Sequence, residues 1–407
     1  MKAKAVKLNS GLFIGMIILL TLMNLMNPQQ IKVSRVENRI LQPKPAFSLE
    51  ALFSGRYFMD YQNYFADAFI GREQLVRIST AVKQLTGPGK MNGVTLVSTG
   101  GGVVQNQAGE AKNAQTGGRV ENNILILGDR ALDVHHFSEP AAAAYAANLN
   151  DFSQLAGSGV RVFSLIAPTQ IEFHEAGGYQ DLSSSQLKTI QFINRKLNPE
   201  IIPVDAYSAL KAHRNEYVYF RTDHHWTALG AYYAYSAFIE QAGEKPVPLR
   251  RYKRGKAEGF LGSLYKQTLN AQLKSHPDTL IYYKPFTKYR FDVYYKEGRV
   301  QGRVIHAGFI GTDRKYGIFL GGDQPWARIR TNNPNGRRIL VVKDSYANAF
   351  IPFLLPHYQE IYMVDSRSFK GKLTDMVKTN RIQDVLFLNY VLVTENPGWI
   401  NQIRQSF

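Results

Sequence analysis

The sequence contains no cysteine, so disulfide bonds are excluded, and this fits an exported protein that folds without them. It also contains no His-Glu-x-x-His spacing, which would place two zinc ligands on one face of a helix. No internal repeat is visible along the 407 residues. With 44% hydrophobic and 12% aromatic residues, the chain has enough apolar side chains to build the core of a globular protein.

Negative charge is also scarce. The 49 Lys and Arg residues outnumber the 32 Asp and Glu residues, which gives a formal net charge of +17. The basic residues are scattered or form short clusters such as 250–256, and there is no long basic tract. Such a charge suits an anionic neighbour, and nucleic acid, phospholipid headgroups or an acidic polymer would all qualify.

One long apolar segment near the N-terminus decides among these partners. No charged residue lies between Leu8 and Ile31, and Lys2, Lys4 and Lys7 precede this span. Basic residues before an apolar span keep the N-terminus in the cytoplasm. No small-x-small cleavage site follows, so we expect an uncleaved, single-pass anchor in the cell membrane rather than a signal peptide. The rest of the chain is then extracytoplasmic, where we expect no nucleic-acid partner.

The composition predicts three parts. Residues 1–31 are expected to form a cytoplasmic tail and the membrane anchor. Residues 32–118 are expected to form a stalk, membrane-proximal helices and a linker. In this part a polar stretch with two prolines precedes aromatic residues at helical spacing and then a segment rich in Gly, Asn and Gln. Residues 119–407 are expected to form an α/β domain.

Strand-like and helical patterns alternate in this third part. Helical patterns separate apolar runs at 160–168, 201–204, 337–342, 360–364 and 384–391. The alternation favours a parallel sheet flanked by helices. Between about 250 and 335 short aromatic and β-branched runs replace the helical patterns, and we expect a β-rich insertion there. One α/β domain with an insertion explains the pattern better than two independent domains.

Ligands of an open parallel sheet collect at the carboxyl ends of its strands, and three stretches meet that condition. In the first, residues 341–350, an apolar strand ends at Lys343-Asp344-Ser345 and a helix follows directly. A serine there lies at the helix N-terminus, whose free amides can hold a developing oxyanion. The alternative is that Asp344 or Ser345 only caps the helix.

The second stretch is TDHHWT, residues 222–227, between a predicted strand at 216–220 and a predicted helix. A catalytic triad needs a base for the serine proton and a carboxylate that fixes the tautomer of that base. Residues i and i+2 of an extended chain face the same way, so Asp223 can pair with His225 while His224 points elsewhere. Capping of the helix by Asp223 is again the alternative.

Metal binding is a further alternative for the second stretch. Asp and His are zinc-type ligands, but adjacent histidines rarely converge on one ion. The remaining histidines are too scattered to name a third ligand. We therefore predict no metal site and no cofactor.

The third stretch, residues 386–391, contains Asn389 and Tyr390 at the end of the last apolar strand. An Asn amide or a Tyr hydroxyl could donate to an oxyanion, or could satisfy loop backbone. Gly262-Ser263 and Gly321-Gly322-Asp323 are further loop segments that could shape a cleft.

Several stretches together resemble one known family. TDHHWT with GAYYAY, the later KDSYANAFIPFLLPHYQEIYMVDSR, and the upstream ENR and LFSGRYFMDYQNYFADAF are similar to the DHHW protein family of bacterial surface proteins. The likeness runs from residue 37 to the C-terminus, and the joint occurrence of Asp-His-His-Trp and Asp-Ser-Tyr is highly specific. That family resembles the SGNH-hydrolase-like domain of alginate O-acetyltransferases. The resemblance therefore implies an SGNH-hydrolase-like three-layer sandwich around the parallel sheet.

Carried over residue by residue, the resemblance implies Ser345 as nucleophile, His225 as base and Asp223 as the acid that orients the base. The Asp-x-His pair precedes the serine in this chain, which is a circular permutation of the usual SGNH order. We expect His224 and Trp226 to pack or hydrogen-bond around these three residues.

The usual SGNH blocks that carry oxyanion residues have no clear match in the sequence. The Ser345 and Tyr346 amides are the first expectation for this role, and Asn389 and Tyr390 are weaker ones.

The resemblance implies an extracytoplasmic serine-dependent O-acetyltransferase or acetylesterase that acts on a cell-wall or secreted polysaccharide. Proteins of this type often act beside a membrane-bound O-acyltransferase, which is the expected protein partner. The alternative is a non-catalytic module that binds polysaccharide or the acyltransferase and keeps the motif for structural reasons.

Overall fold

The structure is a computed structural model. It describes residues 124–174 and 182–407 continuously and, before residue 124, it describes 33–34, 39–40, 44–49, 56–69 and 94–97 with Gly15, Leu52 and Gln74. The chain divides into two compact units, residues 1–122 with 265–271, and residues 123–264 with 272–407.

Short elements make up the described part of the first unit. Strands β1 (Val33–Ser34) and β2 (Arg39–Ile40) pair antiparallel, and α3 (Arg56–Ala68) and β3 (Val94–Val97) follow. The aromatic residues of α3 lie at helical spacing, and the Tyr57 and Tyr61 rings are 6.0 Å apart. The predicted anchor at 8–31 lies, apart from Gly15, outside the described residues. Among the residues that the structure describes, no helix has the length and apolar character needed to cross a membrane.

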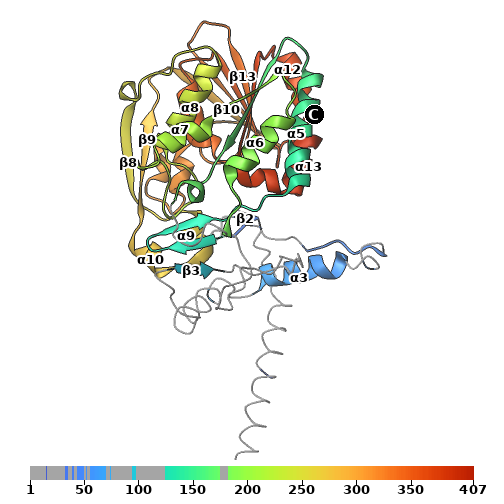
Figure 1. The fold of residues 1–407 in the computed structure, drawn as a ribbon, viewed down its shortest axis with the longest axis vertical. Coiled ribbons are helices and arrows are strands. Elements are labelled where there is room, and N and C mark those ends of the chain that lie inside the picture. Colours follow the sequence, from blue (N-terminus) through green and yellow to red (C-terminus); the bar gives the residue numbers. More distant parts are fainter. Residues whose placement is uncertain are drawn as a thin grey trace, which may run out of the picture. The chain divides into compact units, whose positions relative to one another are not determined.

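An eight-stranded mixed sheet is the centre of the second unit (Figure 1). Its strand order is β11-β10-β12-β14-β13-β15-β6-β7. Five strands are parallel: β6 (Arg161–Ala167), β7 (Ile201–Pro203), β13 (Arg338–Lys343), β14 (Glu360–Val364) and β15 (Asp384–Tyr390). Three antiparallel strands extend the sheet beyond β14: β12 (Trp326–Thr331), β10 (Tyr289–Tyr295) and β11 (Gly298–Gln301).

Alternating side chains of the central strands feed two separate cores. In β13, Ile339 and Val341 belong to one core, whereas Leu340 and Val342 belong to the other. Because successive residues of a strand point to opposite faces, each core covers one face of the sheet. Both faces are therefore buried, which accounts for the nearly continuous apolar runs of these strands.

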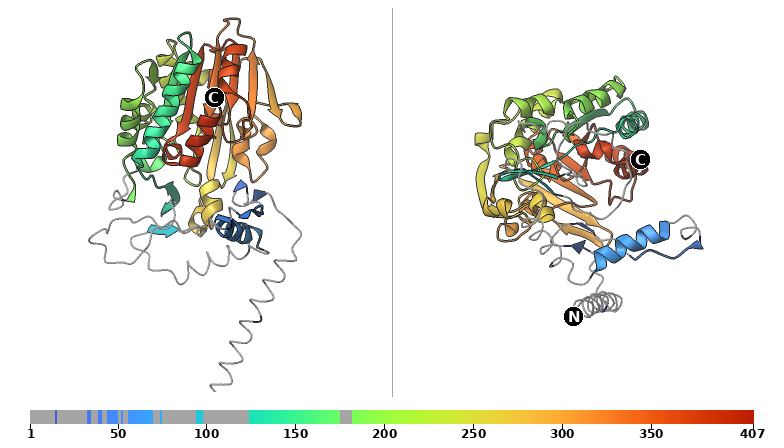
Figure 2. Two further views of the ribbon diagram at one scale, coloured as in Figure 1. Left: turned by 90° about the vertical axis from the view of Figure 1, so that its right-hand side faces the viewer. Right: turned by 60° about the horizontal axis from the view of Figure 1, so that its bottom comes forward.

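Helices close both cores, and the views of Figures 1 and 2 show them on the two sides of the sheet. One face is covered by α5 (Glu139–Ala156), α6 (Gln186–Lys196), α12 (Leu373–Thr379) and α13 (Pro397–Gln405). The other face is covered by α8 (Ala228–Gln241) and α11 (Ala347–Phe350), with α7 (Ala206–Ala212) beside α8. The predicted α/β class with helices around a sheet is confirmed.

The predicted parallel sheet is present as five strands, but the sheet as a whole is mixed, because the region predicted as a β-rich insertion supplies β10, β11 and β12 to the same sheet. The remaining strands form pairs of their own, β4 (Ile124–Leu127) with β5 (Arg130–Asp133), and β8 (Lys253–Phe260) with β9 (Asp278–Lys284). Short helices α9 (Ser263–Thr268) and α10 (Ala271–Ser275) lie between β8 and β9 in sequence. Alternating runs look alike in a separate insertion and in an antiparallel extension, so the sequence pattern could not separate the two.

The predicted strand at 216–220 is also wrong. Val218, Tyr219 and Phe220 are buried in the core, but the segment forms only an isolated bridge between Tyr219 and Trp226. The amide of Thr227 donates to the carbonyl of Val218, so the chain doubles back over the TDHHWT stretch. A tight local turn, and not the edge of the sheet, thus holds this stretch.

Gly230 allows this turn to approach α8. A Cβ atom added at Gly230 would overlap the carbonyl oxygen of Val218, and that backbone cannot move aside without disturbing the core. We predict that Gly230→Ala lowers the free energy of unfolding by about 1–3 kcal/mol, despite the better helix propensity of alanine. Urea denaturation measures the change.

Gly159→Ala is the matched control, because a Cβ atom at this exposed glycine meets nothing within 4 Å. We expect it to change stability by no more than about 1 kcal/mol. Equal midpoints for the two variants would show that the contact at Gly230 is not tight.

Candidate active site

Two turns meet at the carboxyl end of β13. The strand ends at Lys343, and Asp344, Ser345 and Tyr346 lead from it into the short helix α11. The amide of Asp344 donates to the carbonyl of Leu388 on the neighbouring strand β15. The nucleophile predicted from the sequence thus lies where open α/β sheets place their ligands.

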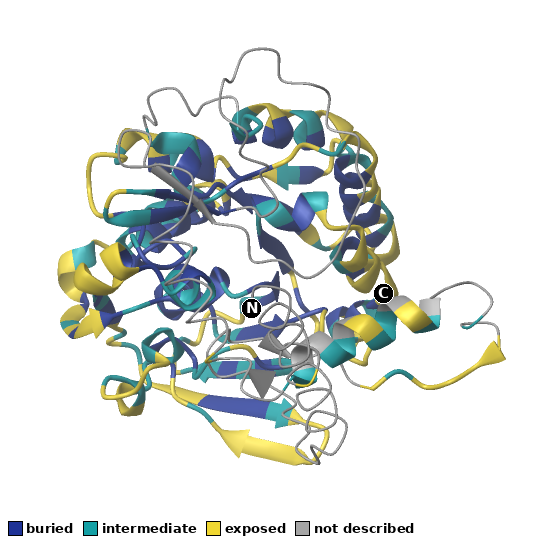
Figure 3. Cartoon of the chain, turned by 90° about the horizontal axis from the view of Figure 1, so that it is seen from below, coloured by how far each residue is buried: buried dark blue, intermediate teal, exposed yellow. Residues whose placement is uncertain are grey.

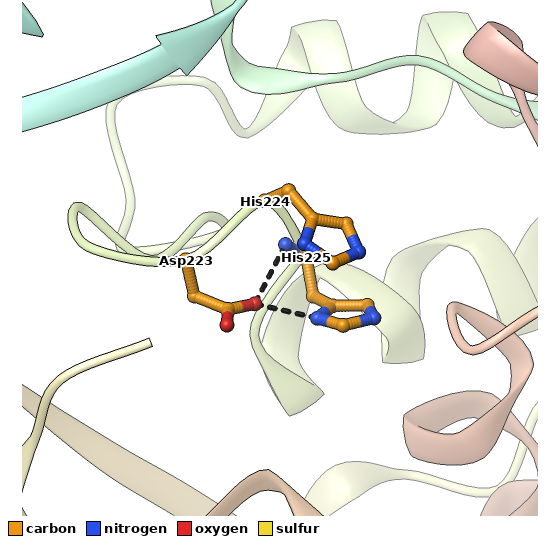
Figure 4. Close-up of side chains that lie close together, drawn as sticks. All are labelled: Asp223, His224 and His225. Carbon is orange, nitrogen blue, oxygen red and sulfur yellow. Dashed lines mark hydrogen bonds and ion pairs between the residues drawn. The ribbon is translucent and has the colours of Figure 1, made fainter. Parts of the chain in front are cut away.

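Ser345, His225 and Asp223 form a hydrogen-bonded chain. His225 Nε2 lies 2.7 Å from Ser345 Oγ, and His225 Nδ1 lies 2.5 Å from Asp223 Oδ1. Figure 4 shows the second half of this chain, with Asp223 Oδ1 also accepting the His225 amide at 3.0 Å. The distances from base to hydroxyl and from base to carboxylate are those of a serine nucleophile with its base and orienting acid.

The carboxylate fixes which nitrogen of His225 carries a proton. Burial would raise the pKa of Asp223, but the charge of His225 and its hydrogen bond hold that pKa well below its usual range. An ionised carboxylate can only accept, so His225 Nδ1 donates to it, and in the neutral imidazole Nε2 is then left as an acceptor. Nε2 is therefore ready to take the proton of the Ser345 hydroxyl.

The other oxygen of Asp223 is held from a separate loop. The Ser263 amide donates to Asp223 Oδ2 at 2.7 Å. A Cβ atom at the preceding residue, Gly262, would overlap the side chain of Asp223, so only glycine lets the loop come this close. The Gly262-Ser263 segment predicted to shape a cleft thus supports the acid itself.

Two aromatic rings enclose the imidazole of His225. The Tyr316 ring is stacked on it with centroids 3.8 Å apart and an interplanar angle of 11°. The His224 ring centroid is also 3.8 Å away, at an angle of 35°. Two rings cannot share one face at that separation, so they cover opposite faces. The Tyr316 hydroxyl donates to the Ser345 carbonyl at 3.1 Å, which ties this ring to the nucleophile turn.

His224 and Trp226 contact their surroundings around the three central residues. His224 Nδ1 lies 2.5 Å from the hydroxyl of Ser263. The buried Trp226 donates its indole N–H to the Tyr346 carbonyl at 2.9 Å, and the Tyr346 hydroxyl donates to the His224 carbonyl. These bonds lock the histidine turn and the serine turn to each other.

Asp278 anchors the chain that enters the histidine turn. Its buried carboxylate accepts the Arg221 amide at 3.1 Å, the Thr222 amide at 2.8 Å and the Thr222 hydroxyl at 2.6 Å. Tyr217 donates its hydroxyl to the same carboxylate. Helix α8 is instead capped by Thr227, whose hydroxyl accepts the Gly230 amide, so the alternative of an Asp223 cap is not what the structure has.

Asp344 engages the side chains and amides predicted to form an oxyanion hole. Its carboxylate accepts the Tyr346 amide at 2.8 Å, the Tyr390 amide at 2.7 Å and the Asn389 side-chain amide at 3.5 Å. The Tyr346 amide and the Asn389 side chain thus donate to a carboxylate. The Tyr390 amide does so as well, whereas the expectation for Tyr390 concerned its hydroxyl. Burial raises the pKa of Asp344 to about 6, and the Tyr390 and Tyr346 amides oppose that rise.

The Ser345 amide is a donor of the predicted set that stays available. It makes no hydrogen bond to any residue in the described part of the chain. An amide in this turn, next to the hydroxyl, is placed to donate to an oxyanion formed on the Ser345 side chain.

An ionic cluster around the buried Lys343 supports the nucleophile turn. Lys343 Nζ is 3.0 Å from Asp323 Oδ1 and 2.8 Å from Asn348 Oδ1. Arg367 approaches the second oxygen of Asp323 at 2.8 Å. Removing Asp323 would leave the buried charge of Lys343 without its ionic partner, which is destabilising. The Asp323 loop predicted from the sequence thus fixes β13 and α11.

Asp223, His224 and His225 are the described residues that could hold a metal ion together. One ligand atom from each lies within 4.8 Å of the others. However, Asp223 Oδ1 and His225 Nδ1 are hydrogen-bonded to each other, and His224 Nδ1 is bonded to Ser263. An ion would have to break these bonds, so the arrangement suits proton transfer better than metal ligation.

Sequence reasoning missed Tyr316 and Asp278. Tyr316 lies in a short 3-10 turn, residues 315–318, and nothing in its neighbourhood marks it as part of a site. Asp278 follows a proline at the start of β9, where an aspartate normally reads as a turn residue. Both act through contacts with residues far along the chain, which a single sequence does not reveal.

Comparisons with known proteins agree on one family. The family model described as "DHHW protein" matches residues 94–364. A DHHW family protein from Eubacterium siraeum has a solved structure that is 35% identical, with a TM-score of 0.64. The match covers 73% of this chain and 98% of that one. A search of curated proteins found no match.

Two more distant solved structures are also similar. Bacillus cereus PatB1, solved with a sulfonyl adduct, is 21% identical with a TM-score of 0.59, over 68% of this chain and 97% of that one. The O-acetyltransferase domain of Pseudomonas putida AlgJ is 15% identical with a TM-score of 0.39, over 69% and 97%. At these identities the likeness to PatB1 shows a shared fold alone.

His224 should make stability depend on pH. Burial lowers its pKa from 6.5 to about 4, the charge of His225 adds to this, and the Asp223 and Asp133 carboxylates oppose it. The imidazole stays neutral in the folded protein but binds a proton at 6.5 when unfolded, so stability is lost as the pH falls from 6.5 to 4. We predict that His224→Gln removes up to about 1.4 kcal/mol per pH unit of this loss.

Urea denaturation of both proteins across this pH range tests the prediction. The difference between the two curves matters, because Asp133 and Asp344, whose pKa values burial raises to about 6, give a slope of the opposite sign. Parallel curves for the two proteins would mean that His224 does not titrate in this way.

Proposed function

The chain belongs to the DHHW protein family, and we propose that it is an extracytoplasmic serine-dependent O-acetyltransferase or acetylesterase. The single observation that carries this proposal is the hydrogen-bonded order Ser345, His225, Asp223, with 2.7 Å and 2.5 Å between the linked atoms. The substrate is a cell-wall or secreted polysaccharide. That part rests on the likeness of TDHHWT and KDSY to the motifs of the alginate O-acetyltransferases.

The first half of the reaction loads the enzyme. Ser345 Oγ attacks the carbonyl carbon of an acetyl donor as its proton passes to His225 Nε2. The Asp223 carboxylate stabilises the imidazolium that results, and the Ser345 amide donates to the oxyanion. The bond to the donor's leaving oxygen breaks, that oxygen takes the proton from Nε2, and an acetyl ester of Ser345 remains.

The second half returns the serine. A sugar hydroxyl, or water in the esterase reaction, gives its proton to His225 Nε2 as its oxygen bonds to the acetyl carbon. The bond from that carbon to Ser345 Oγ breaks, and Oγ takes the proton back from Nε2. The acceptor leaves as an acetyl ester or as acetate, and no metal or cofactor enters either step.

The remaining parts of the proposal concern class and location. We assign the fold to the SGNH-hydrolase class by its resemblance to the alginate O-acetyltransferases. The order is circularly permuted, because Asp223 and His225 precede Ser345 in the chain. The apolar span 8–31 anchors the protein in the cell membrane with its N-terminus in the cytoplasm. A membrane-bound O-acyltransferase beside it supplies the acetyl group.

A non-catalytic module is the second candidate. The contacts of His225 with Asp223, Tyr316 and His224 would stabilise the turn even if the protein catalysed no reaction, and this observation favours the second candidate. In that case the motif would hold a polysaccharide-binding or acyltransferase-binding surface together.

We predict that Ser345→Ala lowers hydrolysis of p-nitrophenyl acetate by at least about 10³-fold, because removing the nucleophile of a triad leaves only binding and oxyanion stabilisation. A fluorophosphonate probe should label the wild type and fail to label this variant. Mass spectrometry of the labelled peptide then locates the adduct.

Urea denaturation provides the control for folding, since Ser345→Ala should leave the midpoint within about 0.5 kcal/mol of the wild type. Asp223→Asn should also lose hydrolysis while keeping the serine. Unchanged turnover in Ser345→Ala, or an unlabelled wild type with an intact fold, would favour the non-catalytic module.

Metal removal separates the serine mechanism from a metal-dependent hydrolase. We expect chelator-washed protein to keep its full rate of p-nitrophenyl acetate hydrolysis, because Asp223, His224 and His225 are bonded within the site. Elemental analysis of the washed sample measures residual metal. Loss of activity that added zinc restores would assign these three residues to an ion instead.

A further inference from the structure

The antiparallel extension of the sheet presents an open basic face. Phe291, Val293, Ala327 and Ile329 of β10 and β12 point into the core on the α8 side. The residues between them point to the other face. In the described part of the chain, the core that covers this second face includes no residue of β10 or β11. Trp326 is the one residue of β12 that packs against it.

Arginine and aromatic side chains fill this face. Across the strands, Arg290 is opposite Arg330, Asp292 is opposite Arg328, and Tyr294 is opposite Trp326. The register with β11 adds Arg299, which is opposite Tyr294. We call the set the arginine face, and it consists of Arg290, Arg299, Arg328, Arg330, Tyr294 and Trp326.

One buried carboxylate organises the arginines. Asp292 lies 3.2 Å from Arg290, 3.2 Å from Arg330 and 3.9 Å from Arg299. Glu360 of β14 is opposite Arg330 on the same face, so the four arginines and these two carboxylates leave an excess of two positive charges. The side chains of Arg290 and Arg299 are 54% and 52% exposed, so their guanidinium groups can reach a ligand. Strand β11 is exposed along its whole length (Figure 3).

The aromatic pair lies at the active-site edge of the sheet. The Tyr294 and Trp326 rings are stacked 3.7 Å apart at an angle of 2°. Trp326 is opposite Val364, and Val364 is opposite Val342, which shortly precedes Ser345. Two strand spacings, about 10 Å, therefore separate β12 from β13 at this edge. The arginine rows extend from the pair for about 13 Å away from the site.

We propose that the arginine face binds an anionic polysaccharide, which rests on the proposed function and names the substrate class. Guanidinium groups bind carboxylates and phosphates through paired hydrogen bonds, and flat sugar faces pack on aromatic rings. A polymer lying on the arginine rows and crossing the Tyr294–Trp326 pair reaches the edge where Ser345 lies. A rigid flat face with charges held by a buried carboxylate suits an extended polymer better than a lipid surface.

The test uses the full 407-residue chain in non-ionic detergent. Calorimetric titration with polygalacturonate, which is anionic, and with dextran, which is neutral, measures binding. We expect the wild type to bind polygalacturonate and not dextran, with affinity that falls as salt is added. Arg290→Gln, Arg299→Gln and Arg330→Gln combined should weaken binding at least about tenfold.

The matched control removes three positive charges elsewhere. Arg195→Gln, Lys196→Gln and Lys211→Gln change exposed residues of α6 and α7 and leave the same net charge as the test variant. We expect this control to bind polygalacturonate within about twofold of the wild type, because binding depends on where the positive charges lie and not only on the total charge. Equal weakening in the two triple variants would overturn the proposal.

Trp326 reports where the polymer lies. Polygalacturonate should change the tryptophan fluorescence of the wild type. Trp326→Phe should remove most of that change, because Trp226 is fully buried and Trp399 packs against Tyr390 and not against Tyr294. A change that persists at full size in Trp326→Phe would place the polymer on another surface. Phosphatidylglycerol in the micelles tests the lipid alternative. If the arginine triple variant lost more of its lipid binding than of its polygalacturonate binding, the face would be assigned to a membrane.

Failure of the two proposals can be told apart. The arginine triple variant should hydrolyse p-nitrophenyl acetate at the wild-type rate, since that small neutral ester does not need the arginine face. Ser345→Ala should bind polygalacturonate as the wild type does. Wild-type protein that binds polygalacturonate but shows no Ser345-dependent hydrolysis would therefore defeat the proposed function alone. Ser345-dependent hydrolysis without polygalacturonate binding would defeat the arginine face alone.

Discussion

The buried carboxylate of Asp223 is the constraint on which the site depends. An ionised group in the interior is stable only when each oxygen has donors, and here the donors come from two directions. His225 bonds one oxygen through its ring and its amide, and the Ser263 amide bonds the other. Two loops that are far apart in sequence are therefore held together by one charge.

The serine turn is held by a parallel arrangement. Asp344 is buried and bonds the amides of Tyr346 and Tyr390, so it links the nucleophile turn to β15. Below it, Lys343 is buried against Asp323 and Asn348. The turn that carries Ser345 is thus fixed by two ionic groups that do not touch the reacting hydroxyl, which keeps that hydroxyl free for His225.

Local rules predicted much of this from the sequence. The period-two spacing of Asp223 and His225 and the strand-to-turn position of Ser345 named three residues that the structure brings together. The central strands and their helices were predicted because buried parallel strands are continuous apolar runs, as in β13 and β15.

Long-range contacts were beyond those rules. Tyr316 and Asp278 join the site through residues distant in sequence, and neither has a local pattern that marks it. The bond between Asn389 and Asp344 was also beyond these rules, because the sequence does not show that a buried Asp344 needs donors of its own. The pairing of β10 with β12 could not be predicted either, because the alternation of residues along a strand does not show which strand it pairs with.

The enclosure of His225 between Tyr316 and His224 has a consequence for the fate of an acylated serine. With a ring 3.8 Å from each face, the imidazole cannot turn over and is reached by solvent only along its edge. Whatever occupies that edge decides whether the next oxygen to arrive belongs to water or to a sugar. A carbohydrate seated there would itself be the barrier to water, so the choice between transfer and hydrolysis would depend on the acceptor being bound.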